Sequence, residues 1–388
     1  MISPAEFPGT AGDTANFSEM IRQLSIGLRV LLICPKSSDS NNKDLGFSSN
    51  VEIIRIPYCP PRLKQIKNEF KLKTYFQLFF FLSVGFFTVL GTLARKRIRF
   101  VFIRHGILTL HLPIIFRLFR IRVIADGELI SDSSKDHINP KILWVLKKYE
   151  KKVMKFYTYF KVSTLNQTEN FQKFGFPKEK ILIIPVGINI KKIPKFPVEE
   201  IPEHTFGYFG VLEKWQGVDL LLEAFELLLA KIPNASLFII GEGSLKESLI
   251  ERVTKNNLSS KVIFTSVPRE VLFHEYFKKF RIVVIPRPKQ KDSTDTLKEF
   301  GLPIKLIESF AAGKPVIVMD IPILKEIPKN TVCIVESSSP EALAKAMKEL
   351  SLDNKKMKEY AKAGLICSRN YDVEDKMKKL VNSLIGER

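Results

Sequence analysis

The stretch Phe300–Ile317, FGLPIKLIESFAAGKPVI, carries the most specific information in this chain. Pro303 suits the first turn of a helix, because its φ is already helical and its missing N–H would have no partner there. Gly313 can adopt the left-handed conformation that ends a helix, and the apolar run after it is typical of a buried parallel strand. The stretch therefore predicts a short helix followed by a strand that is covered on both faces.

Two charged residues of this helix, Lys305 and Glu308, lie three positions apart and so share one face. The simplest interpretation is a salt bridge between them on an ordinary amphipathic helix. A helix N-terminus that carries a lysine is also an anion site, because its free N–H groups and its dipole favour phosphate. A carboxylate one turn further on can accept hydrogen bonds from both hydroxyls of a ribose. The pair therefore also fits a nucleotide site.

The length and charge of the chain limit its class. With 388 residues the chain is long for one hydrophobic core, so we expect two domains. Its 61 Lys and Arg outnumber 41 Asp and Glu, and the net charge of +20 predicts a polyanionic partner: nucleic acid, anionic lipid or a phosphorylated small molecule. The cysteines and histidines show no metal-ligand spacing, so we expect neither a disulfide framework nor a metal site.

Apolar runs alternate with helical patterns along the chain, which is typical of βα units and parallel sheets. The strands expected in the first half are Arg29–Cys34, Val51–Ile56, Phe100–Ile103, Arg122–Ala125, Lys161–Thr164 and Ile181–Pro185. Those expected in the second half are Thr205–Phe209, Ser236–Ile240, Lys261–Phe264, Ile282–Ile285, Pro315–Met319 and Thr331–Val335. The pattern predicts an α/β protein with two doubly wound halves.

The expected domains are residues 1–190 and 205–370, joined by a linker at 191–204 that is rich in proline and charge and followed by a last helix at 371–388. The first strand of a doubly wound domain normally precedes its glycine-rich loop, which here is GTAGDT from Gly9 onward. Only a few residues precede this loop. Either that strand is a stub or the natural chain starts upstream of Met1, and we favour the second interpretation.

The segment Thr74–Ala94 carries no formal charge over twenty-one residues, a length that meets the requirement for a membrane-spanning helix. Between Pro61 and Arg122, thirteen Lys or Arg and one acidic residue give a net charge of +12, distributed on both sides of the segment. Positive charge on both sides contradicts the one-sided bias of a spanning helix. The segment is therefore either a core helix or a helix at an anionic membrane surface, and we favour the second.

The motifs around Pro303, Lys305 and Glu308, together with glycine-rich loops at 207–210 and 241–243, resemble those of glycosyltransferase family 4, the retaining nucleotide-sugar enzymes of the GT-B fold. One subgroup has the donor motif P-x-K-x-x-E. The resemblance covers nearly the whole chain and implies two Rossmann-like domains that face a central cleft. The first would bind the acceptor and the second the donor, with the last helix crossing back to the first.

The resemblance also implies site residues. Those expected to contact the donor are Gly9, Thr10, Gly12, Gly210, Gly241, Gly243, Arg287, Pro303, Ile304, Lys305 and Glu308. Those expected to be catalytic are Lys305, Glu308, Asp126 and His105. Asp126 stands where many members have a histidine, and His105 follows the preceding strand, so both lie at carboxyl ends of strands, where open α/β sheets bind ligands. Alternatively, Asp126 simply caps the following turn.

Two positions depart from the family pattern. Val211 and Gln216 stand where members usually have an arginine and a lysine that contact the diphosphate. We expect Lys305, Arg287 and Lys289 to supply this charge, because guanidinium and ammonium groups neutralise phosphate oxygens. A third departure is the spacing of Glu299 and Glu308, which have eight residues between them where the family has seven, so we assign only the second acid.

The resemblance implies retaining transfer of a hexosyl group from a nucleoside diphosphate sugar to a hydroxyl of a lipid-linked or membrane-associated glycan. Cationic residues would stabilise the departing diphosphate without a metal or other cofactor. A nucleotide-sugar epimerase and a non-catalytic sugar-nucleotide binder are the alternatives. We expect a cytoplasmic protein, peripheral on the inner face of the cell membrane. Nucleic-acid binding is disfavoured because no helix-turn-helix, zinc-finger or aromatic RNA-binding motif is present.

Overall fold

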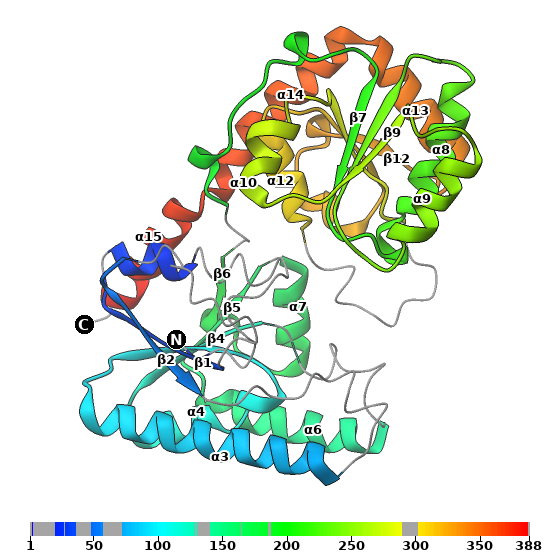
Figure 1. The fold of residues 1–388 in the computed structure, drawn as a ribbon. Helices are drawn as coiled ribbons and strands as arrows, with labels where there is room; N and C mark the ends of the chain where they lie inside the picture. The colour runs from blue at the N-terminus through cyan, green and yellow to red at the C-terminus, as the bar shows by residue number, and fades with distance from the viewer. Residues whose placement is uncertain are drawn as a thin grey trace. The chain divides into compact units, whose positions relative to one another are not determined.

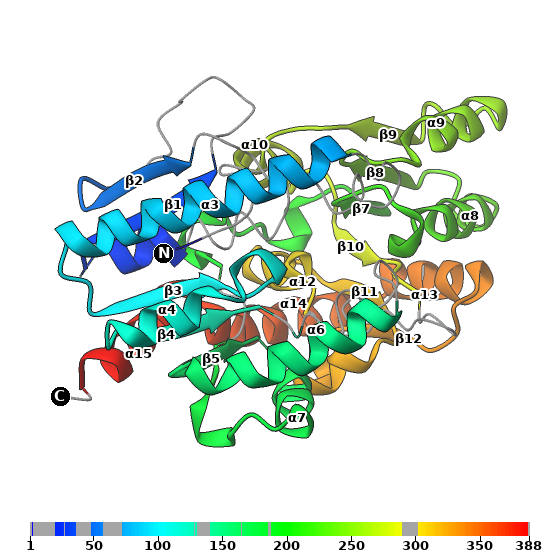
Figure 2. The ribbon, with the colours of Figure 1, turned by 90° about the horizontal axis from the view of Figure 1, so that it is seen from below.

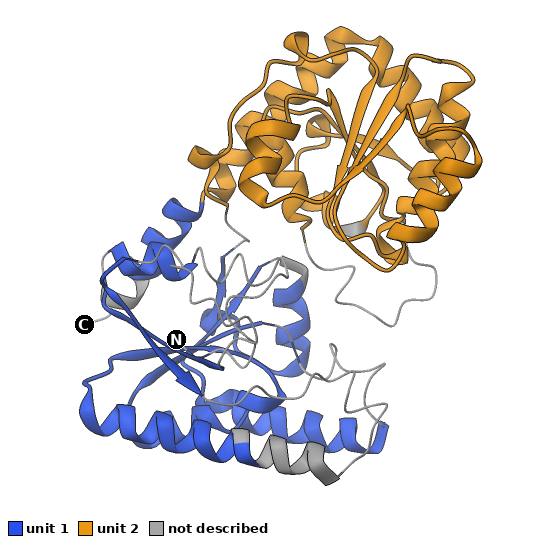
Figure 3. Cartoon of the chain, in the orientation of Figure 1, with its two compact units in different colours: residues 1–187, 293–301, 373–388 blue, residues 188–292, 302–372 orange. Residues whose placement is uncertain are grey.

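The computed structural model describes residues 2, 20–26, 28–35, 48–56, 72–127, 129, 140–163, 165–184, 188–288 and 302–386. The chain divides into two compact units, whose fold is drawn in Figure 1 and whose extents are coloured in Figure 3. Unit 1 comprises residues 1–187, 293–301 and 373–388, and unit 2 comprises residues 188–292 and 302–372. The expected donor residues Gly9, Thr10 and Gly12, and also Lys289 and Glu299, lie outside the described residues.

Unit 2 contains a six-stranded parallel sheet with the order β12-β11-β10-β7-β8-β9. Its strands are β7 (Thr205–Phe209), β8 (Ser236–Ile240), β9 (Val262–Thr265), β10 (Ile282–Ile285), β11 (Val316–Met319) and β12 (Cys333–Val335). The chain starts in the middle of the sheet, builds outward to β9 and then returns to place β10 on the other side of β7. This is the doubly wound order, and ligands of such sheets bind where the direction reverses, at the carboxyl ends of the two central strands.

Successive residues of the unit 2 strands point to opposite faces, so each face has its own hydrophobic core. In β10, Ile282 and Val284 belong to one cluster of buried residues, whereas Val283 and Ile285 belong to the other. The helices that cover the faces are α8 (Val218–Leu229), α9 (Lys246–Lys255), α10 (Arg269–Val271), α12 (Ile304–Ala311), α13 (Pro340–Leu352) and α14 (Asn354–Ser368). Figure 1 shows α8 and α9 on one side of the sheet and α12 on the other.

Unit 1 contains a parallel pair of strands, β1-β2, and a parallel four-stranded group, β3-β4-β5-β6. The strands are β1 (Val30–Pro35), β2 (Val51–Ile56), β3 (Phe100–Arg104), β4 (Arg122–Asp126), β5 (Tyr159–Val162) and β6 (Ile181–Ile183). Ile2 joins the two groups, because it forms parallel bridges to Ile33 of β1 and Ile103 of β3. Ile2 is the described residue of the expected first strand.

The named helices of unit 1 are α3 (Leu72–Arg95), α4 (Leu112–Leu118), α6 (Pro140–Val153), α7 (Leu165–Phe174) and α15 (Val373–Gly386). The last helix packs into this unit, where Met377 and Leu380 join a buried cluster with Ile21 and Leu24. None of the described helices is both long and apolar enough to cross a membrane.

The sequence predicted the twelve strands correctly, and their ends differ from the observed ends by at most two residues. The helix expected near Thr74–Ala94 is present as α3 and is partly buried. Val89 and Thr92 are in the interior, whereas Phe87 is 69% exposed. One side of α3 is therefore a core element, and the expected contact of the helix with an anionic membrane surface remains a prediction.

Candidate nucleotide-sugar site

The carboxyl ends of β7 and β10 bring several of the predicted donor residues together in unit 2. Gly210 follows β7 directly, and Arg287 follows β10 after one proline. These two strands are hydrogen-bonded neighbours at the point where the sheet reverses direction. The predicted residues therefore lie where a doubly wound sheet binds its ligand.

Two glycines allow the loops after β7 and β8 to approach each other closely. The Gly210 N–H donates to the Ile240 carbonyl at 2.9 Å, and the Leu212 N–H donates to the Glu242 carbonyl at 2.8 Å. A Cβ on Gly241, whose φ is +155°, would lie 1.9 Å from the Gly210 carbonyl oxygen. Only glycine fits there without moving the backbone. Gly243, the third predicted glycine, lies in the same loop and would likewise meet the backbone of Leu212.

The short helix α12 ends as its sequence predicted, but it begins just after Pro303, which was expected in its first turn. It begins at Ile304, with Pro303 in an extended conformation just before it. At its end Gly313 has a φ of +72°, its N–H donates to the Phe310 carbonyl, and the next N–H, of Lys314, donates to the Ser309 carbonyl. This is a Schellman motif, which satisfies the last carbonyls of the helix and turns the chain into β11.

Lys305 of α12 reaches the end of β7. Its Nζ donates hydrogen bonds to Gln216 Oε1 at 2.9 Å and to the Tyr208 hydroxyl at 3.3 Å. It lies close enough to Gly210 that a Cβ there would be 2.7 Å from the amine. Burial, and to a smaller extent the positive charge of Arg287, lower the pKa of Lys305 from 10.5 to about 7. An anionic ligand beside this amine would raise its pKa again.

Glu308 lies one turn further along α12 and is only 2% exposed. Its carboxylate forms an ion pair with Arg269, the first residue of α10. The salt bridge between Lys305 and Glu308 that the spacing allows is absent from the described structure, since each side chain has a different partner. Arg269 was missed in the sequence, because nothing in the spacing of the loop after β9 shows that it would meet α12.

Arg287 extends the positive charge of this region. Its guanidinium lies over the ring of Trp215 at 5.3 Å from the centroid, and Trp215 belongs to the same loop as Gln216. A cation stacked on an aromatic face is held in place without losing its hydrogen-bond donors. Val211, where the family has an arginine, is 48% exposed and adds no charge. Lys305 and Arg287 thus both bring positive charge to the switch point.

The predicted residues of unit 1 have different environments. Asp126, at the end of β4, is partly exposed and accepts a hydrogen bond from Lys161 Nζ at 2.6 Å. The side chain of His105 is fully buried, with Nε2 2.8 Å from Glu150 Oε1 and Nδ1 2.9 Å from the Tyr157 hydroxyl. Both ring nitrogens are thus occupied inside the core. This position gives His105 a structural role and does not support its expected contact with an acceptor.

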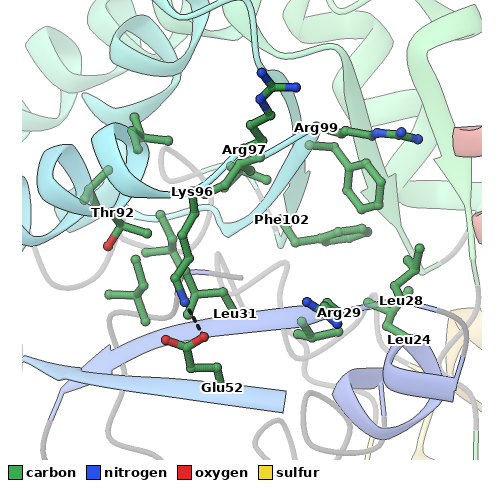
Figure 4. A pocket seen from close by; sticks show the side chains of 18 of the residues that line it. Leu24, Leu28, Arg29, Leu31, Glu52, Thr92, Lys96, Arg97, Arg99 and Phe102 are labelled. Carbon is green, nitrogen blue, oxygen red and sulfur yellow. Dashed lines mark hydrogen bonds and ion pairs between the residues drawn. The ribbon is translucent and has the colours of Figure 1, made fainter. Parts of the chain in front are cut away.

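A cavity of about 1150 Å³ in unit 1 lies away from these residues (Figure 4). It follows the amino-terminal halves of β1 and β3, at the edge of the sheet opposite to Asp126. Arg29, Arg97 and Arg99 line it, together with Lys96, which is paired with Glu52. Three of the thirteen basic residues counted around α3 therefore line this cavity.

The described residues contain no cluster of three or more His, Cys, Asp or Glu side chains that could hold a metal ion. The arrangement in unit 2 instead offers two cations, the backbone of two glycine-containing loops and a buried carboxylate. Such a set can bind a phosphate group and the hydroxyls of an attached sugar.

Comparison with known proteins shows what this chain is similar to. Residues 189–365, nearly all of unit 2, match the family model described as Glycosyl transferases group 1. The chain is similar to glycosyltransferases. This similarity supports a transferase enzyme. The subgroup and its donor motif remain a prediction.

Curated relatives that match part of the chain are also glycosyltransferases. An uncharacterized glycosyltransferase of Methanocaldococcus jannaschii is 26% identical over 52% of this chain, and the chain covers 48% of its length. A Staphylococcus aureus poly(ribitol-phosphate) alpha-N-acetylglucosaminyltransferase is 29% identical over 38% of this chain and 27% of its own length. The chain thus spans about half the length, or less, of these curated relatives.

Two solved structures match over almost all of this glycosyltransferase-like chain. Anabaena HepE in complex with UDP aligns with a TM-score of 0.73 and 14% identity over 98% of both chains. Sucrose-phosphate synthase from Thermosynechococcus elongatus aligns with a TM-score of 0.73 and 18% identity, covering 100% of this chain and 98% of its own. These matches show that the chain has the GT-B fold, as the sequence predicted.

Proposed function

We propose that the protein is a retaining glycosyltransferase that moves a hexosyl group from a nucleoside diphosphate sugar to a hydroxyl of a lipid-linked or membrane-associated glycan. The observation that carries this proposal is the placement of Lys305 beside Gly210 at the switch point of unit 2, with the buried carboxylate of Glu308 one turn away. The names of the relatives, which include a mannosyltransferase and an N-acetylglucosaminyltransferase, support the reaction class.

In the proposed reaction, the anomeric C–O bond to the diphosphate breaks and the acceptor oxygen bonds to the anomeric carbon on the same face of the sugar. Negative charge develops on the departing diphosphate, which takes up the proton of the acceptor hydroxyl. Lys305 and Arg287 stabilise this charge, so no metal ion is required. Glu308 accepts the ribose hydroxyls, and Asp126 orients a hydroxyl at the carboxyl edge of the unit 1 sheet.

The experiment that tests this proposal measures turnover of a panel of UDP-, GDP- and ADP-linked hexoses, with membrane extract as the acceptor source. Glu308→Ala should reduce kcat/KM about a hundredfold, because two hydrogen bonds to a charged group are lost. The matched control is Glu349→Ala, since Glu349 is a largely exposed acid of unit 2 far along the chain from α12. Its turnover should equal that of the wild type.

Other results would favour the alternatives. Conversion of the donor sugar without any acceptor, giving an isomeric nucleotide sugar, would identify an epimerase. Binding of a nucleotide sugar without turnover on any extract would identify a sugar-nucleotide binder. Failure of every nucleotide to bind would contradict the roles of both Lys305 and Glu308. We further propose that the enzyme acts at the inner face of the cell membrane.

A further inference from the structure

Unit 1 carries an unusual set of exposed apolar side chains on three of its helices. Figure 2 shows α3, α4 and α6 on the same side of the unit 1 sheet, the side seen from below. We define the three-helix face as the exposed residues of these helices and of the short turn after α4. Its large apolar members are Phe80, Phe87, Leu118, Phe119, Ile142, Trp144, Val145 and Tyr149. Leu118 is 79% exposed and Trp144 is 59% exposed, so these side chains are solvated along most of their length.

The charged side chains exposed on the three-helix face are all positive. Its exposed basic residues are Arg95, Arg117, Arg120, Lys141, Lys147, Lys148, Lys151 and Lys152. The sequences of α3, α4 and α6 contain a single acidic residue, Glu150. That carboxylate is 0% exposed, because it points into the core and bonds to His105. No exposed carboxylate of these three helices therefore offsets their positive charge.

Helix α6 shows how the apolar and cationic groups are combined. Glu150 and Val153 are its buried residues, so the opposite side of the helix faces solvent. Trp144 lies on that solvent side, and Lys148 Nζ is 3.6 Å from the centroid of its ring. An indole with an ammonium group beside it is the pairing that suits the boundary between lipid headgroups and acyl chains.

We propose that unit 1 docks on an anionic lipid bilayer through the three-helix face. The apolar tips would enter the headgroup region while the surrounding lysines and arginines contact lipid phosphates, as interfacial amphipathic helices do. A second copy of the chain fits less well, because it would bring two cationic faces together. Nucleic acid would satisfy the charge but not the exposed Leu118, Trp144 and Val145. The inference does not depend on the proposed reaction, because docking requires no donor.

Trp144 provides a direct measurement. The chain has two tryptophans, so a Trp215→Phe variant leaves Trp144 as the sole indole reporter. Adding vesicles of phosphatidylcholine mixed with phosphatidylglycerol should shift its emission to the blue and carry the protein upward in a flotation gradient. Vesicles of phosphatidylcholine alone should do neither. About 1 M salt, where the screening length falls to about 3 Å, should weaken the association.

Substitutions on the three-helix face test whether this face is the docking surface. Leu118→Glu combined with Val145→Glu should weaken vesicle association about tenfold or more, since two apolar contacts become repulsive charges. The matched control is Leu352→Glu combined with Ile366→Glu, because these residues of unit 2 are 60% and 56% exposed. The control should float as the wild type does. Circular dichroism checks that both variants are folded.

The proposal is overturned if the wild type fails to float with anionic vesicles at low salt, or if the unit 1 variant floats as well as the unit 2 control. It is also overturned if the emission of Trp144 shifts with protein concentration in the absence of lipid, which would indicate self-association through this face. Displacement of the protein from vesicles by RNA, with RNA binding lost in the unit 1 variant, would assign the face to nucleic acid instead.

Discussion

Lys305 Nζ donates a hydrogen bond to Gln216 Oε1 at 2.9 Å, so a neutral amide lies where the family pattern places a second lysine. A second ammonium group here would repel the amine, whereas the amide oxygen stabilises its protonated form. Burial and Arg287 act in the opposite direction and lower the pKa of Lys305 to about 7. The departure at Gln216 therefore allows one lysine to remain chargeable at neutral pH inside the site.

Donor binding should depend on pH through Lys305. The protonated amine binds the diphosphate, so above its pKa of about 7 each binding event must also take up a proton. The Kd for UDP should then increase up to about tenfold per pH unit above pH 7. Lys305→Met should bind weakly at pH 6 and lose this dependence, whereas the control Lys362→Met should retain it. Isothermal titration calorimetry measures both, and an unchanged slope in Lys305→Met would contradict the assignment.

Gln216→Glu should move the midpoint of the pH dependence of UDP binding to higher pH. A carboxylate in place of the amide favours the charged amine and raises the pKa of Lys305 by about one unit or more. Gln216→Leu removes the acceptor and should move the midpoint to lower pH. The two variants are similar in size, so opposite shifts in calorimetric titrations would separate the electrostatic effect from altered packing. Equal midpoints in both would show that Gln216 does not set the pKa.

Gly241→Ala should destabilise unit 2 by about 2 kcal/mol or more, because its Cβ would collide with backbone at a positive φ. The new Cβ would meet the Gly210 carbonyl oxygen at 1.9 Å. Gly91→Ala is the opposite case, since Gly91 is an exposed residue of α3 and nothing lies within 4 Å of its added Cβ. It should stabilise unit 1 by about 0.5–1 kcal/mol. Urea unfolding measures each free energy, and similar effects at both positions would contradict the close approach of the two loops.

His105→Leu should destabilise unit 1 by about 2–4 kcal/mol, because two hydrogen bonds of a buried group are lost. UDP binding should not change, since the proposed nucleotide residues belong to unit 2. The control is His274→Leu, at an exposed histidine, which should leave stability unchanged. Thermal unfolding together with UDP titration distinguishes this structural role from a catalytic one, which would lower turnover without lowering stability.

Local patterns in the sequence predicted the strands and the ends of α12 well. The left-handed Gly313 and the proline before the helix each act within a few residues, so the residues themselves carry the signal. The placement of Lys305 and Glu308 on one face of α12 follows from helical spacing in the same way.

Partners from distant segments could not be predicted from the sequence. His105 bonds to Glu150 and Tyr157, which are 45 and 52 positions away, so its burial depends on how α6 and its following turn pack under the sheet. The pairing of Glu308 with Arg269 likewise depends on where the loop after β9 meets α12. The sequence gives the number of basic residues around α3 but not where their side chains lie in the fold. In the structure some of these residues line the cavity of unit 1.

The backbone of Ile2 makes the single described link between β1 and β3, donating to the Phe102 carbonyl at 2.8 Å and accepting from the Arg104 N–H at 3.1 Å. Beyond this link the cavity runs along both strands, where neighbouring β pairs elsewhere in the unit form continuous ladders. Among the described residues, the backbone of Ile2 is therefore the point at which the β1-β2 pair and the β3-β4-β5-β6 group are joined.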